Sequence, residues 1–262
     1  MYDQFVCLSG LPRTGSTLLS AILSQNPLIH AEGNSAVCQL MWDMYISCTT
    51  KGKAVEQLLA SNRQRVIYNL ISQIPHIYYQ DINPKEKIIV DKCRSWTISV
   101  NIQLLRKFID ENIKIIILER SIIEIVTSFA KLYKDNKVID YDNKLEKLVK
   151  SNTEPIMRSI KGISWAKRNN EKNTFLFISY DDLIDNPKET ISKIYTFCGW
   201  KPFKHNFKHI FSKYPENDAI YGLVGQHKIR SKISRRKLEV KKLLPEKIIK
   251  ICSKIDNLIL KI

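Results

Sequence analysis

The segment from Gly10 to Thr17 combines residue types that can bind a phosphate or sulfate group. It reads Gly-Leu-Pro-Arg-Thr-Gly-Ser-Thr, which has the glycine spacing of a phosphate-binding P-loop, with Ser16 where the Walker lysine usually stands. Backbone N–H groups in such a loop converge on an anion, and the positive end of the following helix adds to the attraction. The segment therefore predicts an anion-binding loop, the alternative being a plain glycine-rich turn.

Arg13 can supply the positive charge that the missing lysine would bring, because its guanidinium suits phosphate or sulfate oxygens. Ser16 and Thr17 can add hydroxyl donors at the helix start. A nucleotide triphosphatase would also place an aspartate after a later buried strand to hold Mg²⁺. Here the clearest such strand ends in Glu119-Arg120, which favours a second anion site instead.

Short apolar runs alternate with helical patterns along the chain and must position this loop. The runs that read as buried strands are 5–8, 28–31, 87–91, 114–118 and 174–178. Helical spacing covers 16–23, 36–47, 53–74, 95–110, 122–133, 142–170, 187–198 and 245–261. This alternation predicts an α/β, P-loop-type three-layer fold, with a central parallel sheet flanked by helices.

Length and composition predict one domain over residues 1–262, because 262 residues with 44% hydrophobic content can fill one sizeable core. Within this domain, we expect residues 200–262 to form a basic and helical extension that acts as a lid. The formal net charge of +16 attracts polyanions such as nucleotides, nucleic acid or acidic peptides. No recognition motif supports specific binding of nucleic acid.

The six cysteines are scattered without metal-ligand spacing, so we expect no metal site. No apolar stretch approaches the roughly 20 residues of a membrane span, and no signal peptide is recognisable. We therefore expect a chain without a membrane span, in the reducing cytoplasm.

The loop resembles that of the sulfotransferases that use 3′-phosphoadenosine 5′-phosphosulfate (PAPS), particularly the bacterial and tyrosylprotein-type branch with the pattern P-R-[ST]-G-[ST]-T. In that family the loop binds the 5′-phosphosulfate. The resemblance thus assigns cofactor binding to Arg13, Thr14, Gly15, Ser16 and Thr17. It covers about residues 5–198, with a looser extension to 230.

A second similarity is an arginine after a strand with a serine eight positions on, a pair that holds the 3′-phosphate in the family. Arg120 follows the strand at 114–118, and Ser128 lies eight residues later, about two helical turns along. The family's usual Arg-Asp-Pro has become Arg120-Ser121-Ile122, which changes the turn but keeps both ligands.

Two further segments are similar to family motifs. Tyr180 ends a strand and precedes Asp-Asp-Leu, with Asn-Pro shortly after, and it would touch the adenosine side of PAPS. The late segment Gly-Leu-Val-Gly at 222–225, followed by His227, Lys228 and Arg230, is loosely similar to a basic loop over the 3′-phosphate.

The resemblance implies in-line transfer of a sulfuryl group from PAPS to an acceptor hydroxyl, leaving 3′-phosphoadenosine 5′-phosphate (PAP). Arg13 and the loop amides would hold the sulfate and the leaving phosphate. Lys92 matches the family's lysine near the bridging oxygen. Arg94 and Trp96 can line the acceptor pocket.

A general base must take the acceptor's proton. Alignment with the tyrosylprotein branch puts Asn34 where that branch has a glutamate, and an amide cannot act as a base. Glu32, two positions earlier, is our choice, with His30 and Asp91 as other candidates.

Three other functions remain as alternatives. They are a P-loop nucleotide-binding enzyme of another class, such as a small-molecule kinase; a basic nucleic-acid-binding protein; and a cofactor binder made inactive by Asn34. The acceptor can be a small molecule, a glycan or a peptide hydroxyl, and neither its identity nor the oligomeric state can be predicted.

Overall fold

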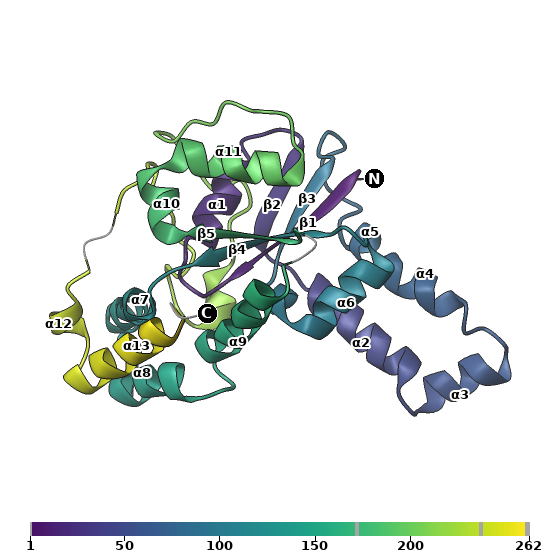
Figure 1. The fold of residues 1–262 in the computed structure, drawn as a ribbon, viewed down its shortest axis with the longest axis horizontal. Coiled ribbons are helices and arrows are strands. Elements are labelled where there is room, and N and C mark those ends of the chain that lie inside the picture. The colour runs from purple at the N-terminus through teal and green to yellow at the C-terminus, as the bar shows by residue number, and fades with distance from the viewer. Residues whose placement is uncertain (1, 171–172, 236–237, 260–262) are drawn as a thin grey trace.

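The structure, a computed structural model, describes residues 2–170, 173–235 and 238–259, and its centre is a parallel sheet (Figure 1). The strands are β1 Gln4–Gly10, β2 Ile29–Asn34, β3 Ile88–Lys92, β4 Lys114–Glu119 and β5 Phe175–Ser179. They lie in the order β2-β3-β1-β4-β5, and every neighbouring pair is parallel. The predicted central parallel sheet is confirmed, with a strand at each predicted apolar run.

Helices connect the strands and cover both faces of the sheet. In the first half of the chain they are α1 Ser16–Leu23, α2 Val37–Thr49, α3 Lys53–Ala60, α4 Val66–Ser72, α5 Ile74–Tyr78, the 3-10 helix η1 Arg94–Thr97, and α6 Ser99–Phe108. In the second half they are α7 Ile122–Asp135, α8 Tyr141–Lys150, α9 Pro155–Arg168, α10 Tyr180–Asp185, α11 Pro187–Cys198, the 3-10 helix η2 Asp218–Tyr221, α12 Val240–Leu243 and α13 Glu246–Ile259.

The alternation of side chains along β1 divides the core into two halves. Phe5 and Cys7 point into a cluster shared with α2, α6, α7, α8, α9 and α13, whereas Val6 and Leu8 point into one shared with α1 and α11. All four side chains are buried, as expected for a strand covered on both faces. The predicted three-layer fold is therefore confirmed, and Figure 1 shows the two helical layers above and below the sheet.

Three predicted helices are divided in the structure. The predicted helix over 95–110 becomes the 3-10 helix η1 and the helix α6. The predicted helix over 53–74 becomes α3 and α4, separated by residues 61–65, with α5 beginning at Ile74. The predicted helix over 142–170 becomes α8 and α9 because Pro155 stands in its interior, where proline removes a backbone donor, and begins α9 instead. The predicted helix at 245–261 is present to Ile259, and its last two residues lie outside the described residues.

Between α11 and α12, the residues that the structure describes contain little regular structure. Residues 214–230, called here the covering segment, include η2 and pass over the carboxyl ends of β2 and β3, where Glu216 meets Gly33 and Lys92. Side-chain contacts hold this segment in place, and the role of residues 200–262 as a lid stays a prediction. No helix of the described chain is long and apolar enough to cross a membrane.

Candidate active site

The anion-binding loop lies between β1 and α1, at the carboxyl end of the central strand of the sheet. Gly10 has a φ of 138°, and a Cβ atom there would lie 2.2 Å from the carbonyl oxygen of Leu118 in β4. Only glycine combines this backbone conformation with so close an approach. The loop then turns through Arg13 and Gly15, whose φ angles are 61° and 84°, before α1 begins. The predicted strand–loop–helix context is present.

The hydroxyl side chains of the loop have different surroundings. Thr14 is fully buried, and its Oγ1 donates to the carbonyl of Leu11 at 2.7 Å, so its side chain holds the loop closed. Ser16 and Thr17 begin α1 and line the cavity described below. Because the N–H groups of a first helical turn lack partners within the helix, this end of α1 can bind an anion together with these two hydroxyls.

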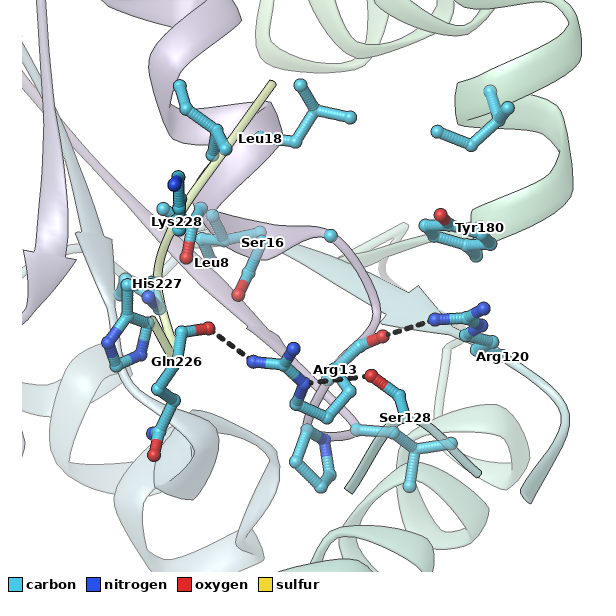
Figure 2. A pocket seen from close by; sticks show the side chains of 18 of the residues that line it. Leu8, Arg13, Ser16, Leu18, Arg120, Ser128, Tyr180, Gln226, His227 and Lys228 are labelled. Carbon is cyan, nitrogen blue, oxygen red and sulfur yellow. Dashed lines mark hydrogen bonds between the residues drawn. The ribbon is translucent and has the colours of Figure 1, made fainter. Parts of the chain in front are cut away.

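Arg13 joins the loop to two distant parts of the chain, as Figure 2 shows. Its Nε donates to the Oγ of Ser128 at 3.1 Å, and its Nη1 donates to the carbonyl of Gln226 in the covering segment. The structure therefore brings together the predicted ligand of the sulfate end and one predicted ligand of the 3′-phosphate.

Arg120 supports the loop from the end of β4. Its Nη1 donates to the carbonyl of Arg13 at 2.9 Å, and its Nε lies 3.0 Å from a carboxylate oxygen of Glu124. Its guanidinium carbon lies 3.9 Å from the ring centroid of Tyr180, a cation–π contact. The ring of Tyr180 in turn lies beside Gly15, where a Cβ atom would meet it at 3.3 Å. These predicted site residues thus form one connected group.

Lys92 ends β3 on the other side of the loop and forms a buried ion pair. Its Nζ lies 2.9 Å from Oε1 of Glu216, and the two side chains are 8% and 9% exposed. Burial lowers the pKa of Lys92 below its ordinary value, and Glu216 opposes that shift. The structure thus places the predicted lysine at the site with a partner that its local sequence does not reveal.

Asn34, which replaces the expected glutamate, also meets Glu216. Its Nδ2 donates to Oε2 of Glu216 at 3.3 Å and to the hydroxyl of Tyr221 at 3.4 Å. The neighbouring Gly33 makes room for this contact, since a Cβ atom there would lie 2.2 Å from the Cγ of Glu216. The end of β2 therefore receives the covering segment.

Glu32 lies in a separate cluster. Its Oε2 is 3.3 Å from Nε2 of His30, whose Nδ1 is 2.9 Å from Oε2 of Glu86. Burial alone would lower the pKa of His30, but the two carboxylates raise it above the ordinary 6.5. Neither Glu32 nor His30 is among the described residues that line the cavity, so the role of Glu32 as base stays a prediction.

Asp91 is fully buried and accepts hydrogen bonds from the hydroxyl of Tyr79 at 2.8 Å and from Nε1 of Trp96 at 2.6 Å. Burial raises the pKa of Asp91, and the hydrogen bonds oppose that shift. Trp96 is 1% exposed and belongs to the core. Of the two residues suggested for the acceptor pocket, only Arg94 is among the described residues that line the cavity.

One cavity connects the loop, the strand ends and the covering segment. The residues that line it are 8–13, 15–18, 34, 92, 94, 120, 128, 129, 180, 184, 226–230 and 232–234. Its cationic side chains are those of Arg13, Lys92, Arg94, Arg120, Lys228, Arg230 and Lys232. The described lining residues include no aspartate or glutamate, so the cavity attracts a ligand with several negative charges.

Glu216, Asp218 and His227 are residues of the site that the sequence analysis did not assign. Glu216 and Asp218 stand in no recognisable motif, and His227 was noted only as part of a basic loop. The structure places Nδ1 of His227 2.6 Å from Asp218 and its Nε2 3.4 Å from Glu216. Glu216 is 124 residues from Lys92 along the chain, so no local pattern could have paired them.

A comparison with models of protein families identifies a family that this chain matches. A family model described as a sulfotransferase domain matches residues 3–254. No curated protein sequence matches the chain significantly.

Solved structures show the same fold at low sequence identity. The sulfotransferase domain of the Synechococcus PCC 7002 olefin synthase is 17% identical, with a TM-score of 0.52 over 97% of this chain and 94% of that one. The sulfotransferase domain from the curacin biosynthetic pathway is 16% identical, with a TM-score of 0.54 over 97% of each chain. Retinol dehydratase, solved with androsterone and the inactive cofactor PAP, is 13% identical, with a TM-score of 0.55 over 100% of this chain and 82% of that one.

Proposed function

The chain belongs to the sulfotransferase family, and from this we propose that it transfers the sulfuryl group of PAPS to an acceptor hydroxyl. Sulfuryl transfer follows from the family, and the choice of PAPS rests on the cavity. PAPS carries anionic groups on both its 5′ and its 3′ side, and the cavity has cationic side chains on both sides of the loop. This distribution of charge is the observation that carries the proposal.

The loop and α1 are proposed to hold the 5′-phosphosulfate. We propose that the backbone amides at the start of α1 bind this group together with the hydroxyls of Ser16 and Thr17, which line the cavity. Arg13 adds a cation that lines the cavity. Lys92 would stabilise the negative charge that develops on the leaving phosphate, because a buried cation acts strongly where water is excluded.

The residues beside Arg13 at the end of β4 are proposed to hold the adenosine 3′-phosphate. Ser128 and Arg120 both contact Arg13 there, and Lys228 and Arg230, which also line the cavity, are proposed as further ligands. Tyr180 presents its ring beside Gly15 and under the guanidinium of Arg120, which supports its role on the adenosine side. All these residues are within one cavity, as a single nucleotide requires.

A kinase that uses Mg-ATP is less consistent with the lining. Such an enzyme usually holds its ion with a carboxylate near the loop, and the described lining residues carry none. The acceptor is proposed only as a hydroxyl compound, since small molecules, glycans and peptides all fit the same chemistry.

The cytoplasm remains the proposed location. All six cysteines are free thiols, five of them buried, which supports a reducing compartment.

Thermal unfolding with PAP, AMP and Mg-ATP tests the proposal. A ligand at about 100 times its dissociation constant adds about 2.7 kcal/mol to the free energy of unfolding, which raises the midpoint by roughly 5–10 °C. We expect PAP to produce this shift and AMP, which lacks the 3′-phosphate, to produce a much smaller one. Stabilisation by Mg-ATP without stabilisation by PAP would reject the assignment of PAPS.

A further inference from the structure

The covering segment places an imidazole between two carboxylates at the edge of the cavity. Nδ1 of His227 lies 2.6 Å from Oδ1 of Asp218, and the backbone N–H of His227 donates to Oδ2 at 3.1 Å. Nε2 of His227 lies 3.4 Å from Oε2 of Glu216. The imidazole is 11% exposed, so its position is held by these contacts.

Asp218 determines which nitrogen of the ring can accept a proton. Its carboxylate can only accept a hydrogen bond, so Nδ1 of His227 must be the donor. A neutral imidazole therefore carries its hydrogen on Nδ1 and its lone pair on Nε2. Burial alone would raise the pKa of Asp218, but hydrogen bonds from His227 hold it below its ordinary value. Asp218 therefore stays ionised, the state required of a carboxylate that orients a catalytic histidine.

His227 also lies close to the groups proposed to bind the sulfate. It lines the cavity and directly follows Gln226, whose carbonyl accepts from the guanidinium of Arg13. Glu216, which faces Nε2, holds Lys92 through its other oxygen. The same small region thus contains the cation proposed for the leaving phosphate and a nitrogen able to take a proton. Figure 2 shows His227 beside Gln226 and Lys228, across from Ser16.

We propose that His227 is the general base of the reaction, with Nε2 as the accepting atom and Asp218 as a positioning residue. This inference rests on the proposed function. It gives the role predicted for Glu32 to a side chain that lines the cavity, whereas Glu32 contacts His30 outside the described lining.

The proton and electron balance of the step is complete without a further reactant. The acceptor O–H bond breaks, its proton moves to Nε2 of His227, and the oxygen forms a bond to sulfur. The bond between sulfur and the bridging oxygen breaks, and the leaving phosphate keeps that electron pair beside Lys92. Asp218 and Glu216, on either side of the ring, stabilise the imidazolium that results.

His227 faces two carboxylates and one aromatic ring. They are the carboxylates of Glu216 and Asp218, and the ring of Tyr221 at 5.5 Å. Lys92 does not face the ring but forms an ion pair with Glu216. A general base cannot accept the acceptor's proton once it is itself protonated, so loss of the base should remove the acidic limb of the pH–rate profile.

Three variants and one control test the assignment. His227→Gln removes the base, Asp218→Asn removes the group that fixes the tautomer, and Glu32→Gln removes the competing candidate. His209→Gln repeats the first substitution at an exposed position outside the described lining. The readouts are PAP release from PAPS, with water and with 2-naphthol as acceptors, its pH profile, and thermal stabilisation by PAP.

General base catalysis contributes about 10²–10⁴-fold to a rate, so His227→Gln should lower kcat by about 100-fold or more while PAP still stabilises the variant. The acidic limb of the pH profile should disappear with it. Asp218→Asn should reduce kcat less and move that limb, and His209→Gln should change nothing.

A His227→Gln enzyme with kcat within about threefold of the wild type would overturn the proposal, as would a loss found only in Glu32→Gln. Failure of PAP to stabilise the wild type is a separate result. It would reject the proposed function, and the assignment of the base with it.

Discussion

Replacing Gly10 by alanine tests whether the phosphate loop depends on the close approach of β1 to β4. The new Cβ atom would lie 2.2 Å from the carbonyl oxygen of Leu118, in a residue with a φ of 138°. That oxygen also accepts a hydrogen bond from the backbone N–H of Leu11, at 3.1 Å. Because the clash is with backbone, no side-chain rotation can relieve it, and the loop must move.

The expected cost follows from these contacts. Forcing a methyl group into a packed site costs about 1–3 kcal/mol, and losing the Leu11–Leu118 hydrogen bond costs about 0.5–1.5 kcal/mol. We expect Gly10→Ala to lower the free energy of unfolding by about 2–4 kcal/mol, and the midpoint by roughly 5–15 °C. Stabilisation by PAP should shrink as well, since the loop that begins at Gly10 is displaced.

Gly52→Ala is the matched control. Gly52 has an extended backbone with a φ of 168°, and a Cβ atom there would meet nothing within 4 Å. We expect its stability to stay within about 0.5 kcal/mol of the wild type. If Gly10→Ala unfolds at the same temperature as Gly52→Ala and responds equally to PAP, the argument from the loop geometry is refuted.

Three further predictions follow from named contacts. Arg120→Lys keeps the charge but loses the stack on Tyr180, so titration calorimetry should show about tenfold weaker PAP binding. Lys92→Met leaves Glu216 buried without its cation and should cost about 3 kcal/mol in urea unfolding. Adding Glu216→Gln should restore stability but not turnover. The raised pKa of His30 means that its stabilising charge is fully present below pH 6.5 and is lost as the pH rises through the raised value. The stability difference between wild type and His30→Gln should therefore be largest below pH 6.5 and shrink as the pH rises above it.

The sheet could be predicted because each strand carries its own signal. The run at 114–118, for example, is short, apolar and β-branched, and all of Ile115, Ile116, Ile117 and Leu118 are buried in β4. Helix ends were harder to predict because they depend on single residues. Pro155 begins α9 where periodicity alone predicts an unbroken helix over 142–170.

The positions of the residues predicted to bind the cofactor could be inferred for the same reason, and their role stays a prediction. The loop directly follows β1, Arg120 directly follows β4, and Ser128 lies in α7, the next helix, so local order along the chain gives their place at one edge of the sheet. The cluster of residues around the proposed base could not be predicted in this way, because no local sequence pattern brings its members together. His227 meets Glu216 and Asp218 across the turns of a segment with little regular structure, and that segment meets Lys92 only after folding.

A contact formed only on folding also explains Asn34, the residue whose amide suggested an inactive cofactor binder as an alternative function. Asn34 donates to Glu216, 182 residues further along the chain, and Glu216 faces both Lys92 and His227. An amide suits this position because it donates to a carboxylate, whereas a glutamate here would oppose the charge of Glu216 in a buried setting. The departure from the family pattern therefore has a physical role in this chain. Asn34 alone is no argument that catalysis has been lost, because the base proposed here, His227, lies in the covering segment.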